Sequence, residues 1–100
     1  MGSVNQGHAT EYVAECFWPG VQEADLISLD ERAAASAAAL SSDGVTVRYI
    51  GSLVMRDDEV VLCRFEGPES AVRRVAERAG IPFERILEAG HSSGTGDAAL

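Results

Sequence analysis

Residues 45–66, VTVRYIGSLVMRDDEVVLCRFE, predict a β-hairpin and with it the centre of the fold. Both ends of the stretch are rich in β-branched and aromatic residues, whereas the segment RDDE at residues 56–59 is typical of a polar turn. Residues 60–66 are apolar at positions that would face both sides of a sheet, as expected of a central strand. We therefore expect one strand over residues 45–54 and the next over residues 60–66.

A further strand is predicted on each side of the hairpin. The sequence YVAECFWPG combines aromatic and β-branched residues with a closing Pro-Gly, so a strand is expected over residues 10–18. Residues 83–89 supply the last strand. The polar ends, residues 1–9 and 92–100, are expected to be flexible arms, which leaves residues 10–91 as one domain.

Two helices are predicted between these strands. Ser28 and Glu31 have the spacing of a capping box, and an alanine-rich run of high helix propensity continues to Leu40. The second helix is expected from Pro68, which suits a first helical position, to a C-terminal cap at Gly80. Each helix has one narrow apolar stripe and would bury that face.

The predicted order of elements is β-α-β-β-α-β, which indicates an α+β, ferredoxin-like fold. Both helical stripes are buried most simply when the two helices lie on one face of a four-stranded antiparallel sheet, with the first and third strands as central neighbours. The opposite face of the sheet would then be left uncovered by the chain itself. We therefore expect a homodimer that packs through that face or through the edges of the sheet.

The composition excludes two classes of function. The net charge is −8, with 16 acidic residues and 8 basic residues that are all arginine, so the phosphate backbone of a nucleic acid would be repelled. No apolar run approaches the roughly 20 residues that a membrane helix needs. The chain also starts without the pattern of a signal peptide, which makes the cytoplasm the expected location.

The two cysteines, Cys16 and Cys63, are assigned to the core. Alternation places both thiols on the helix-facing side of adjacent central strands. Free cysteine in such a position packs as a small apolar side chain and is usually unreactive.

Charged side chains are predicted to gather on the uncovered face of the sheet. Alternation along the first strand places Glu15 there. The same reasoning brings Arg64 to this face. Arg48 joins it if Val47 and Tyr49 point towards the helices, and Glu88 joins it if Leu87 does. We predict a cluster of these four charges, with Arg64 as the partner of Glu15. The cluster would bind a small anion, supply Glu15 as a general base, or form a structural ion-pair network in a dimer interface.

Three other side chains are candidates for ligand contacts. Trp18, directly before the Pro-Gly turn, would either line a pocket at the sheet edge or close the end of the core. His8 and His91 are the only histidines, and His91 could bind a metal together with a carboxylate of a partner subunit. No His-x-x-x-His or Cys-x-x-Cys spacing is present, and the alternative is two exposed histidines near the chain ends.

Several segments resemble a family of small bacterial ferredoxin-like proteins that often carry the label of a domain of unknown function. The segments are YVAECFWPGV, GVTVRYIGSLVMRDDEVVLCRFEGPES and AVRRVAERAGIPFERILEA, and the resemblance covers most of residues 12–89. One branch of the family forms homodimers and binds nickel at the dimer surface, so the resemblance implies a homodimer that sequesters nickel. Related sequences often have a histidine in the second strand, where this chain has Arg48-Tyr49.

Together these features predict a small homodimeric ligand-binding protein more readily than an enzyme. No nucleophile elbow, phosphate-binding loop or dinucleotide fingerprint is present. The resemblance favours nickel or another divalent metal as the ligand. The alternative is a small-molecule-binding protein or enzyme that uses the open sheet face, or a cavity between two sheets, around Glu15. A third hypothesis is an interaction module without a ligand.

Overall fold

The computed structural model describes residues 10–90 of the chain, and its elements follow the predicted order. The elements are the strands β1 (Glu11–Phe17), β2 (Arg48–Met55), β3 (Val60–Glu66) and β4 (Arg85–Ala89), and the helices α1 (Glu23–Ser42) and α2 (Glu69–Arg78). The arms expected at residues 1–9 and 92–100 lie outside the described residues, so the domain boundaries stay a prediction.

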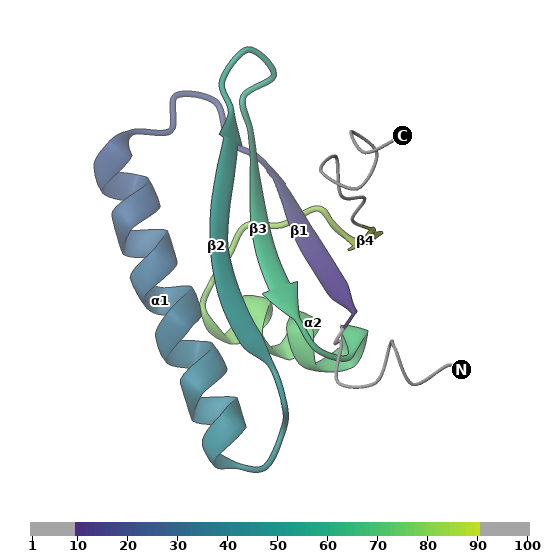
Figure 1. The fold of residues 1–100 in the computed structure, drawn as a ribbon. Helices are drawn as coiled ribbons and strands as arrows, with labels where there is room; N and C mark the ends of the chain where they lie inside the picture. Colours follow the sequence, from purple (N-terminus) through teal and green to yellow (C-terminus); the bar gives the residue numbers. More distant parts are fainter. Residues whose placement is uncertain (1–9, 91–100) are drawn as a thin grey trace, which may run out of the picture.

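The four strands form one antiparallel sheet in the order β2-β3-β1-β4. The first and third strands are central neighbours, as the sequence predicted. Figure 1 shows the strands with α2 behind them and α1 alongside β2. The contacts of α1 with β2 and α2, and of α2 with β1, place both helices on one face. The fold is therefore α+β and ferredoxin-like.

The core lies between the helices and the sheet. The Phe65 ring is fully buried and packs against the Tyr49 ring with 5.0 Å between the ring centroids; burying a side chain of this size contributes about 1.5–3 kcal/mol. Around it lie the other fully buried large side chains: Leu29, Leu40, Val61, Val72, Val75, Cys16 and Cys63. Both cysteines are free thiols in this core, as predicted.

Helix α1 begins earlier than the capping-box pattern at Ser28 predicts. The Asp25 carboxylate accepts a hydrogen bond from the backbone N–H of Gln22 at 2.8 Å, which places the N-terminal cap there. Leu26 packs against the same core as Leu29, so the additional turn buries more apolar surface. Helix packing therefore outweighs the local preference of Ser28 for a cap.

Strand β2 begins three residues later than predicted. The backbone N–H of Val45 donates to the carbonyl of Leu40 at 3.1 Å, and the Ser41 hydroxyl donates to the carbonyl of Val47 at 2.9 Å. The segment after α1 thus stays attached to the helix before it joins the sheet. Pairing with β3 is interrupted between Tyr49 and Gly51, as in a β-bulge.

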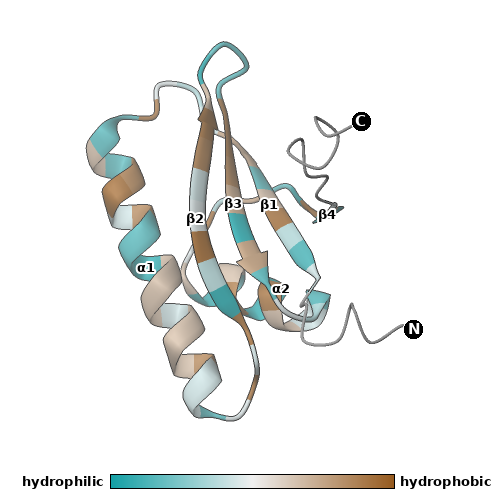
Figure 2. Cartoon of the chain, in the orientation of Figure 1, coloured by the Kyte–Doolittle hydropathy of each residue, from teal (hydrophilic) through white to brown (hydrophobic). Residues whose placement is uncertain are grey.

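The strands differ in how apolar and polar residues follow one another. Figure 2 shows hydrophobic and hydrophilic residues mixed along β1, and a hydrophilic turn between β2 and β3. The central strand β3 begins with four apolar residues, Val60, Val61, Leu62 and Cys63, as predicted for a strand with apolar residues on both faces. Within residues 10–90, neither helix is long and apolar enough to cross a membrane.

Candidate functional site

The side of the sheet away from the helices, here called the open face, carries the charged residues of the strands. Residues paired across antiparallel strands share a face, so the register with Glu11, Glu15 and their neighbours defines this surface. Its larger side chains are Glu11, Val13, Glu15, Phe17, Arg48, Leu53, Met55, Val60, Leu62, Arg64, Glu66, Arg85 and Leu87.

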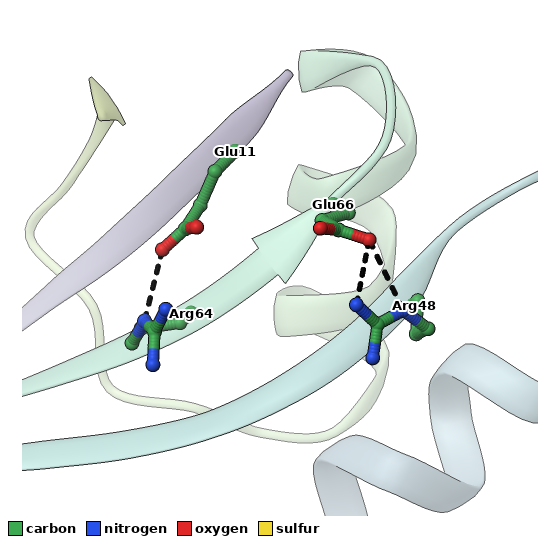
Figure 3. Close-up of polar contacts among 4 residues, drawn as sticks. All are labelled: Glu11, Arg48, Arg64 and Glu66. Carbon is green, nitrogen blue, oxygen red and sulfur yellow. Dashed lines mark hydrogen bonds and ion pairs between the residues drawn. The ribbon is translucent and has the colours of Figure 1, made fainter. Parts of the chain in front are cut away.

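Three ion pairs cross the open face, and Figure 3 shows two of them. Arg64 Nε donates to Glu11 Oε2 at 2.9 Å. Arg48 donates from Nε and Nη2 to a single oxygen of Glu66, at 3.1 and 2.8 Å. The third pair joins Arg85 to Glu15 between β4 and β1.

The register explains why the predicted partner of Glu15 is wrong. In β3, Glu15 lies opposite Leu62, while Arg64 lies opposite Val13, two residues further along. Arg64 therefore reaches Glu11, and Glu15 is left to Arg85, its direct neighbour in β4. The hydrogen bonds to these carboxylates raise the pKa values of both Arg64 and Arg85. Glu15, Arg64 and Arg48 do share the open face, but they belong to three separate pairs.

Glu88 does not join this face. It pairs with Tyr12, which packs against the core, so the Glu88 position belongs to the helix-facing side. Ile86, not Leu87, points towards the core, and Leu87 lies opposite Val13 on the open face. The prediction for β4 was wrong because Ile86 and Leu87 are adjacent and both apolar, so alternation alone does not show which of the two faces the core.

The ion pairs neutralise the charge of the open face, but they add little to the stability of the fold. The side chains of Arg48 and Arg85 are 64% exposed, and ion pairs exposed to this degree contribute little to stability because solvent screens them. Glu11, with a side chain 9% exposed, is the most buried member. Among residues 10–90, three carboxylates of the open face pair with three guanidinium groups, so these charges balance although the chain carries −8.

Trp18 lies at the end of β1 beside the β2–β3 turn. Its ring is partly buried against the core, and its backbone N–H donates to the carbonyl of Glu59 at 2.7 Å. The cavity that it lines with Val21 and Arg56 has a volume of about 180 Å³. This is below the 300–1,000 Å³ typical of small-molecule pockets, so closing the core is the role that this position supports.

Metal ligands are sparse in the described part of the chain. His8 and His91 lie outside it, and residues 10–90 contain no group of three or more His, Cys, Asp or Glu side chains that could hold a metal ion. Both cysteines are buried. Contact with the Cys16 thiol, together with burial, raises the pKa of Cys63, which disfavours the thiolate that a metal requires.

A half-buried polar cluster that the sequence did not indicate joins α1 to β2. The Tyr49 hydroxyl donates a short hydrogen bond to Asp30 Oδ1, and the Ser52 hydroxyl donates to the same oxygen at 3.0 Å. Burial and the bond to Asp30 raise the pKa of Tyr49. Tyr49 and Ser52 are three residues apart, and strict alternation would place them on opposite faces. They share a face only because of the β-bulge between Tyr49 and Gly51.

We expect this cluster to make stability depend on pH in alkaline solution. Because the folded-state pKa of Tyr49 is raised, its contribution is complete below the unfolded-state pKa of about 10 and decreases as the pH rises above that value. Tyr49→Phe should lower the free energy of unfolding by about 1 kcal/mol at neutral pH and weaken the alkaline decrease. Urea unfolding at neutral and alkaline pH measures both effects.

Ser52→Ala is the matched control for this prediction. It removes the other donor to Asp30 but keeps the titrating phenol of Tyr49, so the alkaline decrease should persist in this variant. An equal decrease in Tyr49→Phe and the wild type would show that Tyr49 does not cause it.

Comparison with known proteins agrees with this architecture. A family model described as "Nickel responsive protein SCO4226-like" matches residues 12–89. The chain belongs to the SCO4226-like family. A crystal structure of SCO4226 from Streptomyces coelicolor A3(2) superposes with a TM-score of 0.60 at 24% sequence identity, covering 83% of this chain and 99% of that chain. Among curated proteins, none matches this SCO4226-like chain.

Proposed function

We propose that this chain is a homodimeric nickel-binding protein that holds its ligand without turning it over. The observation that carries the proposal is membership of the SCO4226-like family, whose model is described as nickel-responsive and spans nearly the whole described domain. The balanced, partly apolar open face supports the homodimer.

The donor set limits where nickel would bind. Imidazole, thiolate and carboxylate are suitable nickel ligands, but residues 10–90 of one protomer offer no cluster of three, and the thiols are buried. The residues left to hold the metal are His8 and His91, together with carboxylates, including those of a second protomer. A nickel ion bound by these residues would link the two protomers.

The open face has the properties of a surface that meets a second copy of the chain. Phe17, Leu53 and Met55 are 54%, 50% and 46% exposed on it, and the pairing of Phe17 and Met55 with Val60 brings them close together. A group of exposed apolar side chains marks an interaction surface, whereas single ones do not. Elsewhere the net negative charge would make two copies repel one another. On the open face the three internal ion pairs remove that repulsion. Two copies can therefore pack there at the lowest electrostatic cost.

Nickel should raise the melting temperature of the full chain. A ligand that binds only the folded state adds about 2.7 kcal/mol at 100 times its Kd, which corresponds to a rise of roughly 10–20 °C for a domain of this size. Thermal unfolding with and without nickel, together with isothermal titration calorimetry, measures the effect. Magnesium serves as the control ion, because it prefers oxygen ligands.

The double variant His8→Ala/His91→Ala tests the ligands. It should unfold like the wild type without metal and lose most of the nickel-dependent rise. Unchanged melting of the wild type at millimolar nickel, with no heat of binding, would contradict the proposal.

A small molecule bound between two sheets near Glu15 is the second candidate. It is less well supported, because the Glu15 carboxylate already accepts a hydrogen bond from Arg85 and would have to exchange that partner for a ligand. Glu15→Gln separates the two uses of this residue. A change in dimer stability with nickel binding intact favours a structural ion pair, whereas the loss of a small-molecule ligand with dimerisation intact favours the second candidate.

A further inference from the structure

A groove lies on the edge of the domain opposite β4, between the C-terminal half of α1 and the start of β2. Its volume is about 720 Å³, and its walls include Ala34, Ala38 and Ser41 of α1, with Val45 and Tyr49 on the other side. The volume lies within the 300–1,000 Å³ that small-molecule sites occupy.

The groove is preformed, because its far wall is fixed in place. The segment between α1 and β2 is tied to the helix by the hydrogen bonds Val45 N–H to Leu40 carbonyl and Ser41 hydroxyl to Val47 carbonyl. On its other side it packs tightly on Gly67, where an added Cβ would lie 2.8 Å from the carbonyl oxygen of Thr46. The wall therefore cannot collapse onto the short alanine side chains of α1. A preformed site avoids the free-energy cost of ordering itself when it binds.

Arg48 and Glu66 supply the charged groups of the groove. Two N–H groups of Arg48 donate to one oxygen of Glu66, which holds the planar guanidinium in one orientation. Arginine carries five N–H donors, so donors remain for a ligand. Because each charge neutralises the other in a chain of net charge −8, the groove attracts neither anions nor cations strongly. Its chemistry is that of a mainly apolar wall with the hydroxyl groups of Ser41 and Thr46 and one cationic donor, Arg48.

We propose that this groove binds an uncharged, mainly apolar small molecule that carries a hydrogen-bond acceptor. The apolar part lies against Ala34, Ala38 and Val45, and the acceptor receives a hydrogen bond from Arg48. The groove shares the Arg48–Glu66 ion pair with the open face, but its apolar wall is formed by α1 and by Val45, which lie outside that face.

Prodan, an uncharged naphthalene dye with a ketone acceptor, is a suitable probe, because its fluorescence shifts to shorter wavelength in apolar surroundings. The full chain should bind it saturably. Ala38→Leu fills the groove from an exposed helix position and should raise the Kd by at least about tenfold, as expected when added methyl groups occupy a ligand's space. Ala35→Leu is the matched control, since Ala35 is also an exposed residue of α1 but does not line the groove; its Kd should stay within about twofold of the wild type.

A second pair of variants tests the hydrogen bond. Arg48→Met keeps much of the apolar stem but removes the donors, and should raise the Kd by about threefold to tenfold. Arg64→Met removes an arginine that is likewise paired with a glutamate, on the open face outside the groove, and should leave the Kd unchanged.

Three results would overturn the proposal: no saturable binding, equal effects of Ala38→Leu and Ala35→Leu, or loss of binding in Leu53→Arg with Ala38→Leu unaffected. The last result would place the dye on the open face. The nickel-dependent rise in melting temperature should be the same in Ala38→Leu and the wild type, so failure of this proposal is distinguishable from failure of the nickel proposal.

Discussion

Replacing Leu53 with arginine is expected to convert the proposed homodimer into monomers. Leu53 is 50% exposed on the open face, close to the centre of the β2–β3 pairing and opposite Leu62. In a symmetric interface the substitution occurs twice, and each new guanidinium would be buried against apolar side chains without a carboxylate partner. An uncompensated buried charge costs about 3–5 kcal/mol, which amounts to a loss of affinity of at least about 100-fold.

The monomer itself should tolerate the change, because half of the Leu53 side chain is already exposed. Ile27→Arg is the matched control: Ile27 is 54% exposed but lies on α1, away from the open face. Light scattering coupled to size-exclusion chromatography, over a range of protein concentrations, distinguishes the two variants. A dimeric Leu53→Arg protein would exclude this part of the open face as the interface, and a monomeric wild type would reject the homodimer.

Gly67→Ala is expected to cause the largest loss of stability among single methyl additions. Gly67 follows β3 with φ at +143°, a conformation that side-chain-bearing residues rarely adopt. An added Cβ would also lie 2.8 Å from the carbonyl oxygen of Thr46 and 3.2 Å from the Cα of Val47. Because both neighbours are backbone atoms, relief requires moving the segment that joins α1 to β2. We expect a loss of about 3 kcal/mol or more, or roughly 10–20 °C in melting temperature.

Gly80→Ala separates the two causes of this loss. Gly80 also has a positive φ, +70°, but an added Cβ there meets nothing within 4 Å. Only the conformational cost remains, about 1 kcal/mol. Thermal and urea unfolding of both variants measures the difference. Equal losses would mean that the close approach of Gly67 to Thr46 does not constrain the fold.

The two surfaces considered for ligands differ in how far the sequence could predict them. Alternation placed Glu15, Arg48 and Arg64 on the open face, because a side chain's face depends only on its position along its own strand. The same reasoning failed for Glu88, since β4 contains two adjacent apolar residues and either could point inward. The groove beside α1 was not predictable, because it results from the way the segment after α1 is held between the helix and Gly67.

The sequence by itself determined the order of the elements, the antiparallel hairpin and the place of both cysteines in the core. These follow from local propensity and from the periods of helix and strand, which are properties of short segments. Only the tertiary structure decided which charges pair. Glu15 binds Arg85 and Glu11 binds Arg64 because the register of β1 against β3 and β4 is set by packing across the whole sheet, and a shift of two residues would exchange the partners without changing any side chain's face.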